Sequence, residues 1–149
     1  MRGGFCYDEA MKLSRAEFER FVAEGVEVIP QKFRDKIHNV VFMVEDEPSL
    51  EIRREHKLGP DKTLLGHYHG LPLSERGDLY GVGMTLPDTI LIYQKPIEEE
   101  AAALVAERGG DFVHKVRHIV ADTVWHEIAH HFGFDEREVR QREDERGLH

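Results

Sequence analysis

The sequence predicts a protein that combines amphipathic helices with a few short strands, and three observations carry this prediction. Apolar residues recur at helical spacing after capping residues at Ser14 and at Asp111. Runs rich in β-forming residues stand at 40–44 and 89–93. Glycine and proline pairs lie between such segments, as is typical of turns.

The N-terminal half is predicted to begin with a helix. Ser14 and Glu17 form a capping box, and the apolar residues after them indicate a helix over about 14–25. A short helical turn is expected over 30–37, because it opens on a proline. The nearly continuous apolar run at 40–44 then predicts a buried strand.

The middle of the chain is more polar. Residues 50–62 are charged and close with a Gly-Pro pair, which favours an exposed excursion. Residues 63–70 alternate weakly and predict a strand. The Gly- and Pro-containing segment 71–87 is expected to be a long surface loop with a short strand near 80–84, and 89–93 is a second strong strand.

The C-terminal part is predicted to be helical. Pro96 begins an alanine-rich helix, which the Gly109-Gly110 pair ends. Asp111 is placed to cap the next helix, whose apolar residues form one stripe ending at Phe132. A last, highly charged helix is expected over about 136–146.

An HExxH motif lies near the end of the long helix. On a helix, His126 and His130 are one turn apart and about 40° apart around the axis, so both imidazoles can reach one metal ion. Glu127 falls between them, where it can act on a water molecule at the metal. Because so short a motif also arises by chance, the alternative is a histidine-rich helix end that faces solvent.

The residues after the motif offer a third metal ligand. Gly133 can adopt the left-handed conformation that ends a helix, so the chain can turn back and present a carboxylate from Asp135 or Glu136. Two imidazoles and one carboxylate, with a fourth position left for water, are typical of catalytic zinc. A structural zinc site is more often rich in thiolates, and the sequence has a single cysteine, Cys6.

The other histidines, and Asp122, are expected to have packing, supporting or surface roles. His131 points about 100° away from His130, which favours a packing or ligand-supporting role. Asp122 could orient a ligand imidazole, although a solvated helix face is the favoured interpretation. His67 and His69 would share one face of a strand, where such a pair is more often a surface feature than a ligand pair.

Composition limits the class of protein. With 149 residues, we expect an N-terminal arm at 1–13 and a single domain at 14–149. A net charge of -9 argues against nucleic acid or an anionic membrane as the main partner. No apolar run is long enough to span a membrane or to serve as a secretion signal, and one cysteine cannot form an intramolecular disulfide. A cytoplasmic protein is therefore expected.

The segment from Pro96 to Glu136, which ends in HEIAHHFGFDE, resembles the small bacterial zincin-like metallopeptidases, also called minimal zincins. The segments 70–77 and 86–90 support the resemblance. It implies an α+β fold in which a short mixed sheet packs against the helix that carries HExxH, with flanking helices. It also implies one zinc ion held by His126 and His130, with Glu127 as base. The family tends to have Asp where this chain has Glu136, and we favour Glu136 as third ligand because it keeps the spacing from Gly133.

The expected function is therefore zinc-dependent hydrolysis of peptide bonds in a peptide or protein substrate, with Glu127 as general base. An edge strand at 63–70 could align the substrate backbone. Tyr68, Tyr93 and His131 are candidate oxyanion donors. The alternatives are a zinc-binding interaction module without turnover and a zinc hydrolase of a non-peptide amide.

Overall fold

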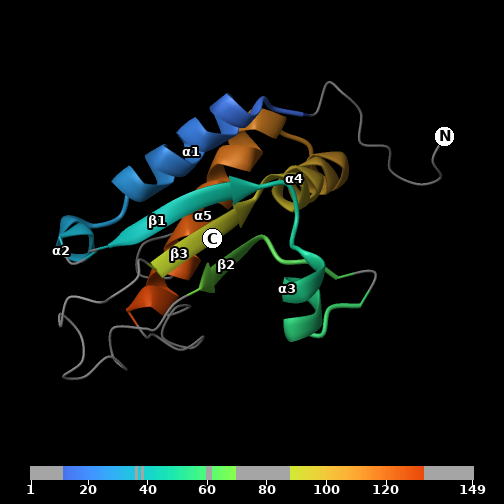
Figure 1. The fold of residues 1–149 in the computed structure, drawn as a ribbon. Coiled ribbons are helices and arrows are strands. Elements are labelled where there is room, and N and C mark those ends of the chain that lie inside the picture. Colours follow the sequence, from blue (N-terminus) through green and yellow to red (C-terminus); the bar gives the residue numbers. More distant parts are fainter. Residues whose placement is uncertain (1–11, 36, 38, 60–61, 70–87, 133–149) are drawn as a thin grey trace.

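A computed structural model describes residues 12–35, 37, 39–59, 62–69 and 88–132. The helices and strands within these residues follow one another in a mixed order (Figure 1). They are α1 (Arg15–Glu27), α2 (Gln31–Arg34), β1 (Val40–Glu45), α3 (Leu50–Glu55), β2 (Gly66–His69), β3 (Asp88–Tyr93), α4 (Gln94–Arg108) and α5 (Phe112–His131). The predicted α+β class is confirmed.

The described strands form one mixed sheet with the order β1-β3-β2. β1 is parallel to β3, with Phe42 opposite Ile90, whereas β2 is antiparallel to β3, with Gly66 opposite Ile92. β3 is therefore the central strand of this sheet, and β2 lies at one of its edges. The short mixed sheet expected from the resemblance is present.

One face of the sheet is covered by helices. Figure 1 shows α5 running behind the sheet beside α1, and α5 contacts α1, α4, β2 and β3. Ile90 and Ile92 of β3 are fully buried on this face, as are Phe18 of α1 and Val124 of α5. Burial of these apolar side chains is the main force that holds α5 against the sheet.

The long helix α5 begins and ends close to the predicted residues. Asp111 caps it, since a carboxylate oxygen of Asp111 accepts a hydrogen bond of 2.8 Å from the backbone N–H of His114. Before it, Gly109 and Gly110 have φ values of 77° and 108°, a conformation that favours glycine and ends α4. The capping box of α1, formed by Ser14 and Glu17, is also present.

The prediction of a buried strand at 40–44 was wrong for one face of β1. Val41 is 42% exposed and Met43 is 45% exposed, while Phe42 is partly buried in the core. The reason is the alternation of side chains along a strand, because Val41 and Met43 point to the face of β1 opposite to the core-facing Phe42. An apolar run does not reveal which face is covered.

Two helices differ from the predictions. α3 lies within the segment for which an exposed excursion but no helix was predicted, and the Ser49 hydroxyl caps it by accepting from the Ile52 N–H. The expected exposure is confirmed, because none of the residues of α3 is buried. α4 begins at Gln94, two residues before Pro96. The helix can include this proline because the N–H groups of its first turn have no partner within the helix, so the missing N–H of Pro96 breaks no helical hydrogen bond.

Several predictions lie outside the described residues. These are the arm at 1–13 except for its last two residues, the loop and short strand within 71–87, the turn at Gly133 and the helix over 136–146. Among the described residues, no helix is both long and apolar enough to cross a membrane.

Candidate active site

His126 and His130 lie in the last turns of α5, on the same side of the helix. Their ring centroids are 5.0 Å apart and the rings meet edge to face at 71°. Both side chains are partly exposed, so a ligand in solvent can reach them. Two imidazoles at this separation suit Zn²⁺, which accepts nitrogen donors readily.

Glu127 is held in a different environment from its two neighbours. Its relative exposure is only 8%, although it carries a carboxylate. The cause is the position of β2, since a Cβ placed on Gly66 would lie 3.3 Å from Glu127 Cγ and 2.8 Å from Thr123 Cγ2. The main chain of β2 therefore passes directly over α5 at Glu127, and only glycine leaves enough room.

A buried hydrogen-bond network connects β2, β3 and the end of α5. The Tyr68 hydroxyl donates to Asp88 Oδ2 at 2.7 Å, and His131 Nδ1 lies 2.8 Å from the same oxygen. His131 is 1% exposed, so its interaction with Asp88 fixes the helix turn that carries His130. The packing role expected for His131 is thus confirmed, whereas no pattern in the sequence indicated the role of Asp88.

Tyr93 lies in the core, close enough to Glu127 for the two groups to interact electrostatically. Tyr93 is fully buried, and its hydroxyl has no hydrogen-bond partner among the described residues. Burial raises the pKa of Tyr93 to about 12, and the carboxylates of Glu45 and Glu127 contribute to this shift. Because Tyr93 does not reach solvent, it is a poor candidate for the oxyanion donor.

Asp122 and His118 form a pair on the surface of α5. Asp122 Oδ2 lies 3.5 Å from His118 Nε2, and the two side chains are 34% and 42% exposed. This arrangement agrees with the solvated helix face that the sequence favoured for Asp122.

The third metal ligand cannot be placed in the same way. Glu136 and its alternative, Asp135, both lie outside the described residues. The structure brings together His126, Glu127 and His130, and the carboxylate ligand stays a prediction from the spacing after Gly133.

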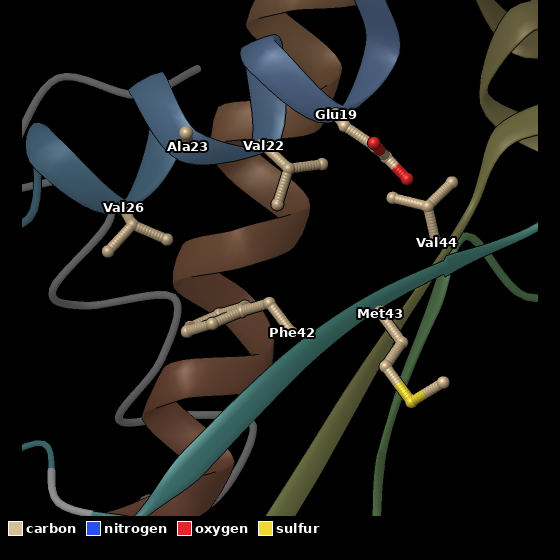
Figure 2. Close-up of a pocket in the computed structure, with 7 residues that line it drawn as sticks. All are labelled: Glu19, Val22, Ala23, Val26, Phe42, Met43 and Val44. Atoms are coloured by element: carbon tan, nitrogen blue, oxygen red, sulfur yellow. The ribbon is translucent and has the colours of Figure 1, made fainter. Parts of the chain in front are cut away.

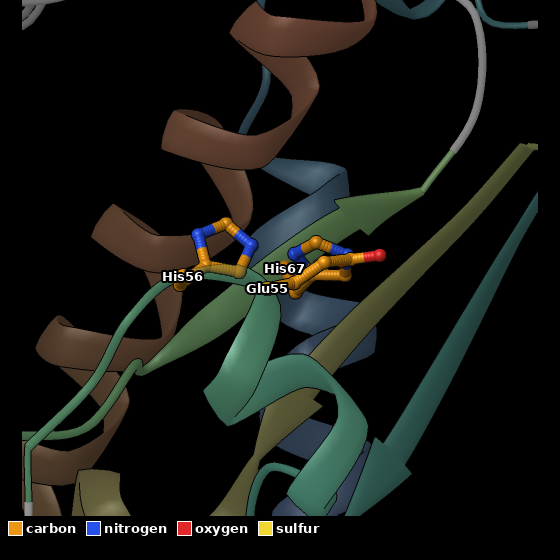
Figure 3. Close-up of side chains that lie close together, drawn as sticks. All are labelled: Glu55, His56 and His67. Carbon is orange, nitrogen blue, oxygen red and sulfur yellow. The ribbon is translucent and has the colours of Figure 1, made fainter.

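The pair His67 and His69 was interpreted from the sequence as a surface feature. His67 of β2 lies close to His56 and Glu55, which follow one another at the end of α3 (Figure 3). Burial, followed by the effects of neighbouring imidazoles, lowers the pKa of His67 from its ordinary value of 6.5. The sequence signal was the alternation of His67 and His69, but nothing in it linked α3 to this strand.

An apolar surface pocket of about 670 Å³ lies elsewhere, between α1 and β1. Figure 2 shows Val22 and Phe42 facing this space, while Met43 points away from it. Among the described residues that line the pocket, Glu19 is the only charged one, and none of them carries an imidazole or a nucleophile. It lies at the β1 edge, opposite to the β2 edge that covers Glu127.

Sequence comparisons relate this arrangement to known proteins. The model of one protein family, described as zincin-like metallopeptidase, matches residues 37–146. The matched part contains the whole described sheet together with α4 and α5. A comparison with curated proteins gave no match.

Proposed function

Because this chain belongs to the zincin-like metallopeptidase family, we propose that it hydrolyses peptide bonds with Glu127 as the general base beside a single zinc ion. Membership of the family implies a zinc-binding hydrolase that acts on peptides or proteins. The observation that carries the finer proposal is the position of Glu127, a buried carboxylate in the helix turn that also carries two partly exposed imidazoles.

His126 and His130 would hold the zinc ion, together with a carboxylate that we assign to Glu136. When bound, zinc polarises the scissile carbonyl and lowers the pKa of a water molecule toward about 7. The remaining residues of the site then have to orient the substrate and to move one proton.

Glu127 is suited to move that proton. In the proposed reaction its carboxylate accepts a proton from the attacking water and later delivers it to the leaving amine. Its burial under β2 limits the carboxylate to a few orientations, so that little freedom is lost when it receives the proton. A metal site with a purely structural role would not need a buried carboxylate next to its ligands.

β2 is the element that would position the substrate. It lies at an edge of the described sheet and passes over α5 at Glu127. An extended peptide that adds to such an edge gains backbone hydrogen bonds and is delivered to the base in a defined register. We therefore assign peptide alignment to Gly66–His69.

The proposal is tested by hydrolysis of a peptide library with three preparations: the parent, the chelated protein and the chelated protein after zinc has been added back. We expect hydrolysis to be lost on chelation and restored by zinc. His126→Ala and His130→Ala should each lose the zinc of this site and hydrolysis, so that one equivalent less is bound than by the parent. The control His114→Ala, an exposed histidine of α5, should retain both. Full zinc retention in both ligand variants would rule out this metal site.

The third ligand is tested by competitive zinc titration. Glu136→Ala should weaken zinc binding by at least about tenfold, because removal of one of three protein ligands leaves only two imidazoles. Asp135→Ala, the matched control, should bind zinc like the parent. A larger loss of affinity in Asp135→Ala would move the carboxylate ligand one residue earlier.

A further inference from the structure

A second group of potential metal ligands lies between α3 and β2. Glu55, His56 and His67 each offer a ligand atom, and these atoms all lie within 4.8 Å of one another (Figure 3). We call this group the α3–β2 cluster. It shares no residue with the HExxH motif, and the sequence assigned it no function.

The cluster resembles the HExxH pair in its geometry. The ring centroids of His56 and His67 are 5.0 Å apart and the rings meet at 89°, and the centroids of His126 and His130 are also 5.0 Å apart. Zinc bonds of 2.0–2.1 Å in a tetrahedral site place ligand atoms about 3.3 Å apart. Because Glu55 and His56 are exposed, their side chains can rotate to close the remaining distance.

The strand supplies a possible additional ligand. His69 lies two residues after His67 on the same strand face, with ring centroids 6.2 Å apart. A set of imidazoles with one carboxylate favours a borderline transition-metal ion such as Zn²⁺ over Ca²⁺ or Mg²⁺, which prefer oxygen ligands.

A metal at this position would also explain how α3 is held in place. None of the residues of α3 is buried, so apolar burial contributes little to holding the helix against the sheet. The Arg53 guanidinium donates to the backbone oxygens of Gly59 and Lys62, which connects the helix only to the segment that follows it. A metal bound by His56 and His67 would connect α3 to β2 directly.

We propose that the α3–β2 cluster is a second zinc site, in which Glu55, His56 and His67 join α3 to the edge strand that covers Glu127. This site is separate from the proposed catalytic metal, so it can exist whether or not the HExxH residues catalyse hydrolysis. Its role is to hold α3 and to stiffen β2.

The test is a zinc titration of metal-free protein against a chromophoric chelator, with Co²⁺ as a spectroscopic probe of the ligand set. We expect the parent to bind two equivalents and His67→Ala or His56→Ala to bind one. The His126→Ala/His130→Ala variant should also bind one, and adding His67→Ala to it should remove that equivalent. The control His114→Ala should bind two.

Hydrogen exchange gives a readout that is independent of activity. Zinc should slow the exchange of the α3 amides by about tenfold or more in the parent, and this effect should be absent in His67→Ala. Stoichiometry that is unchanged by both His56→Ala and His67→Ala would overturn the proposal. If the His126→Ala/His130→Ala variant does not fold, the zinc stoichiometry of His56→Ala and His67→Ala alone decides whether the second site exists. If the parent binds only one equivalent of zinc and His67→Ala removes it, the result would contradict the proposed catalytic zinc site and leave the α3–β2 site standing.

Discussion

Replacement of Gly66 by alanine tests the contact that places β2 over Glu127. The added Cβ would lie 2.8 Å from Thr123 Cγ2 and 3.1 Å from the Leu91 carbonyl oxygen, whereas ordinary contacts begin at 3.4 Å. Thr123 cannot rotate away freely, because its buried hydroxyl donates to the Ile119 carbonyl oxygen at 2.8 Å. The strand must therefore move away from α5 by about half an ångström.

The expected cost follows from this overlap. Overpacking of a close contact costs about 1–3 kcal/mol. Replacement of glycine by alanine recovers about 0.4–1 kcal/mol through the unfolded chain. We therefore expect Gly66→Ala to lower the free energy of unfolding by about 1–2 kcal/mol. Hydrolysis should fall as well, because the strand moves relative to Glu127.

Urea unfolding of the metal-free proteins measures this cost without a contribution from zinc binding. Gly59→Ala is the matched control, since a Cβ at Gly59 meets nothing within 4 Å. Its free energy of unfolding should be unchanged or slightly higher. Thr123→Ser keeps the hydroxyl but removes Cγ2, so it should reduce the cost of Gly66→Ala by about 1 kcal/mol in a double-mutant cycle. Equal stability of Gly66→Ala and Gly59→Ala, without coupling to Thr123→Ser, would refute the close approach of β2 to α5.

Two further predictions concern buried polar groups near the site. Asp88→Ala should lower the free energy of unfolding by about 2–4 kcal/mol, because Tyr68 and His131 both lose the interaction with its carboxylate. Tyr68→Phe removes the hydroxyl donor together with its hydrogen bond, so it should lower the free energy of unfolding by only about 1 kcal/mol. Equal losses for Asp88→Ala and Tyr68→Phe in urea unfolding would contradict the shared role of Asp88. The pKa of Tyr93 is raised from 10.0 to about 12, so the unfolded phenol loses its proton first and stability should fall as the pH rises through this range. Tyr93→Phe should weaken that fall between pH 10 and 12, and an unchanged profile of stability against pH would show that Tyr93 is not buried as described.

The elements that the sequence predicted best are those specified by local signals. The capping box at Ser14 and the cap at Asp111 each act within three residues, and both are present in the structure. α3 was not predicted because its cap, Ser49, is followed by charged residues without an apolar stripe. Propensity and periodicity reveal little about a helix that buries none of its residues.

In the candidate site, too, the residues that are close in sequence were predicted and those that are far apart were not. His126, Glu127 and His130 are close in sequence, so helical geometry alone was enough to bring them together. Asp88 was not predicted, because its partners Tyr68 and His131 are 20 and 43 positions away. Contacts of this kind depend on strand order and register, which single-sequence patterns do not specify.

The most direct test of the proposed function is a measurement of zinc content and peptide hydrolysis on one preparation of Glu127→Gln. Glutamine has nearly the shape of glutamate but cannot accept the proton of the attacking water. The variant should bind zinc like the parent, and its rate of hydrolysis should fall by a factor of about 10² to 10⁴, the range of general-base catalysis. Hydrolysis at the parental rate would show that Glu127 is not the base, and loss of zinc would show that it is a ligand instead.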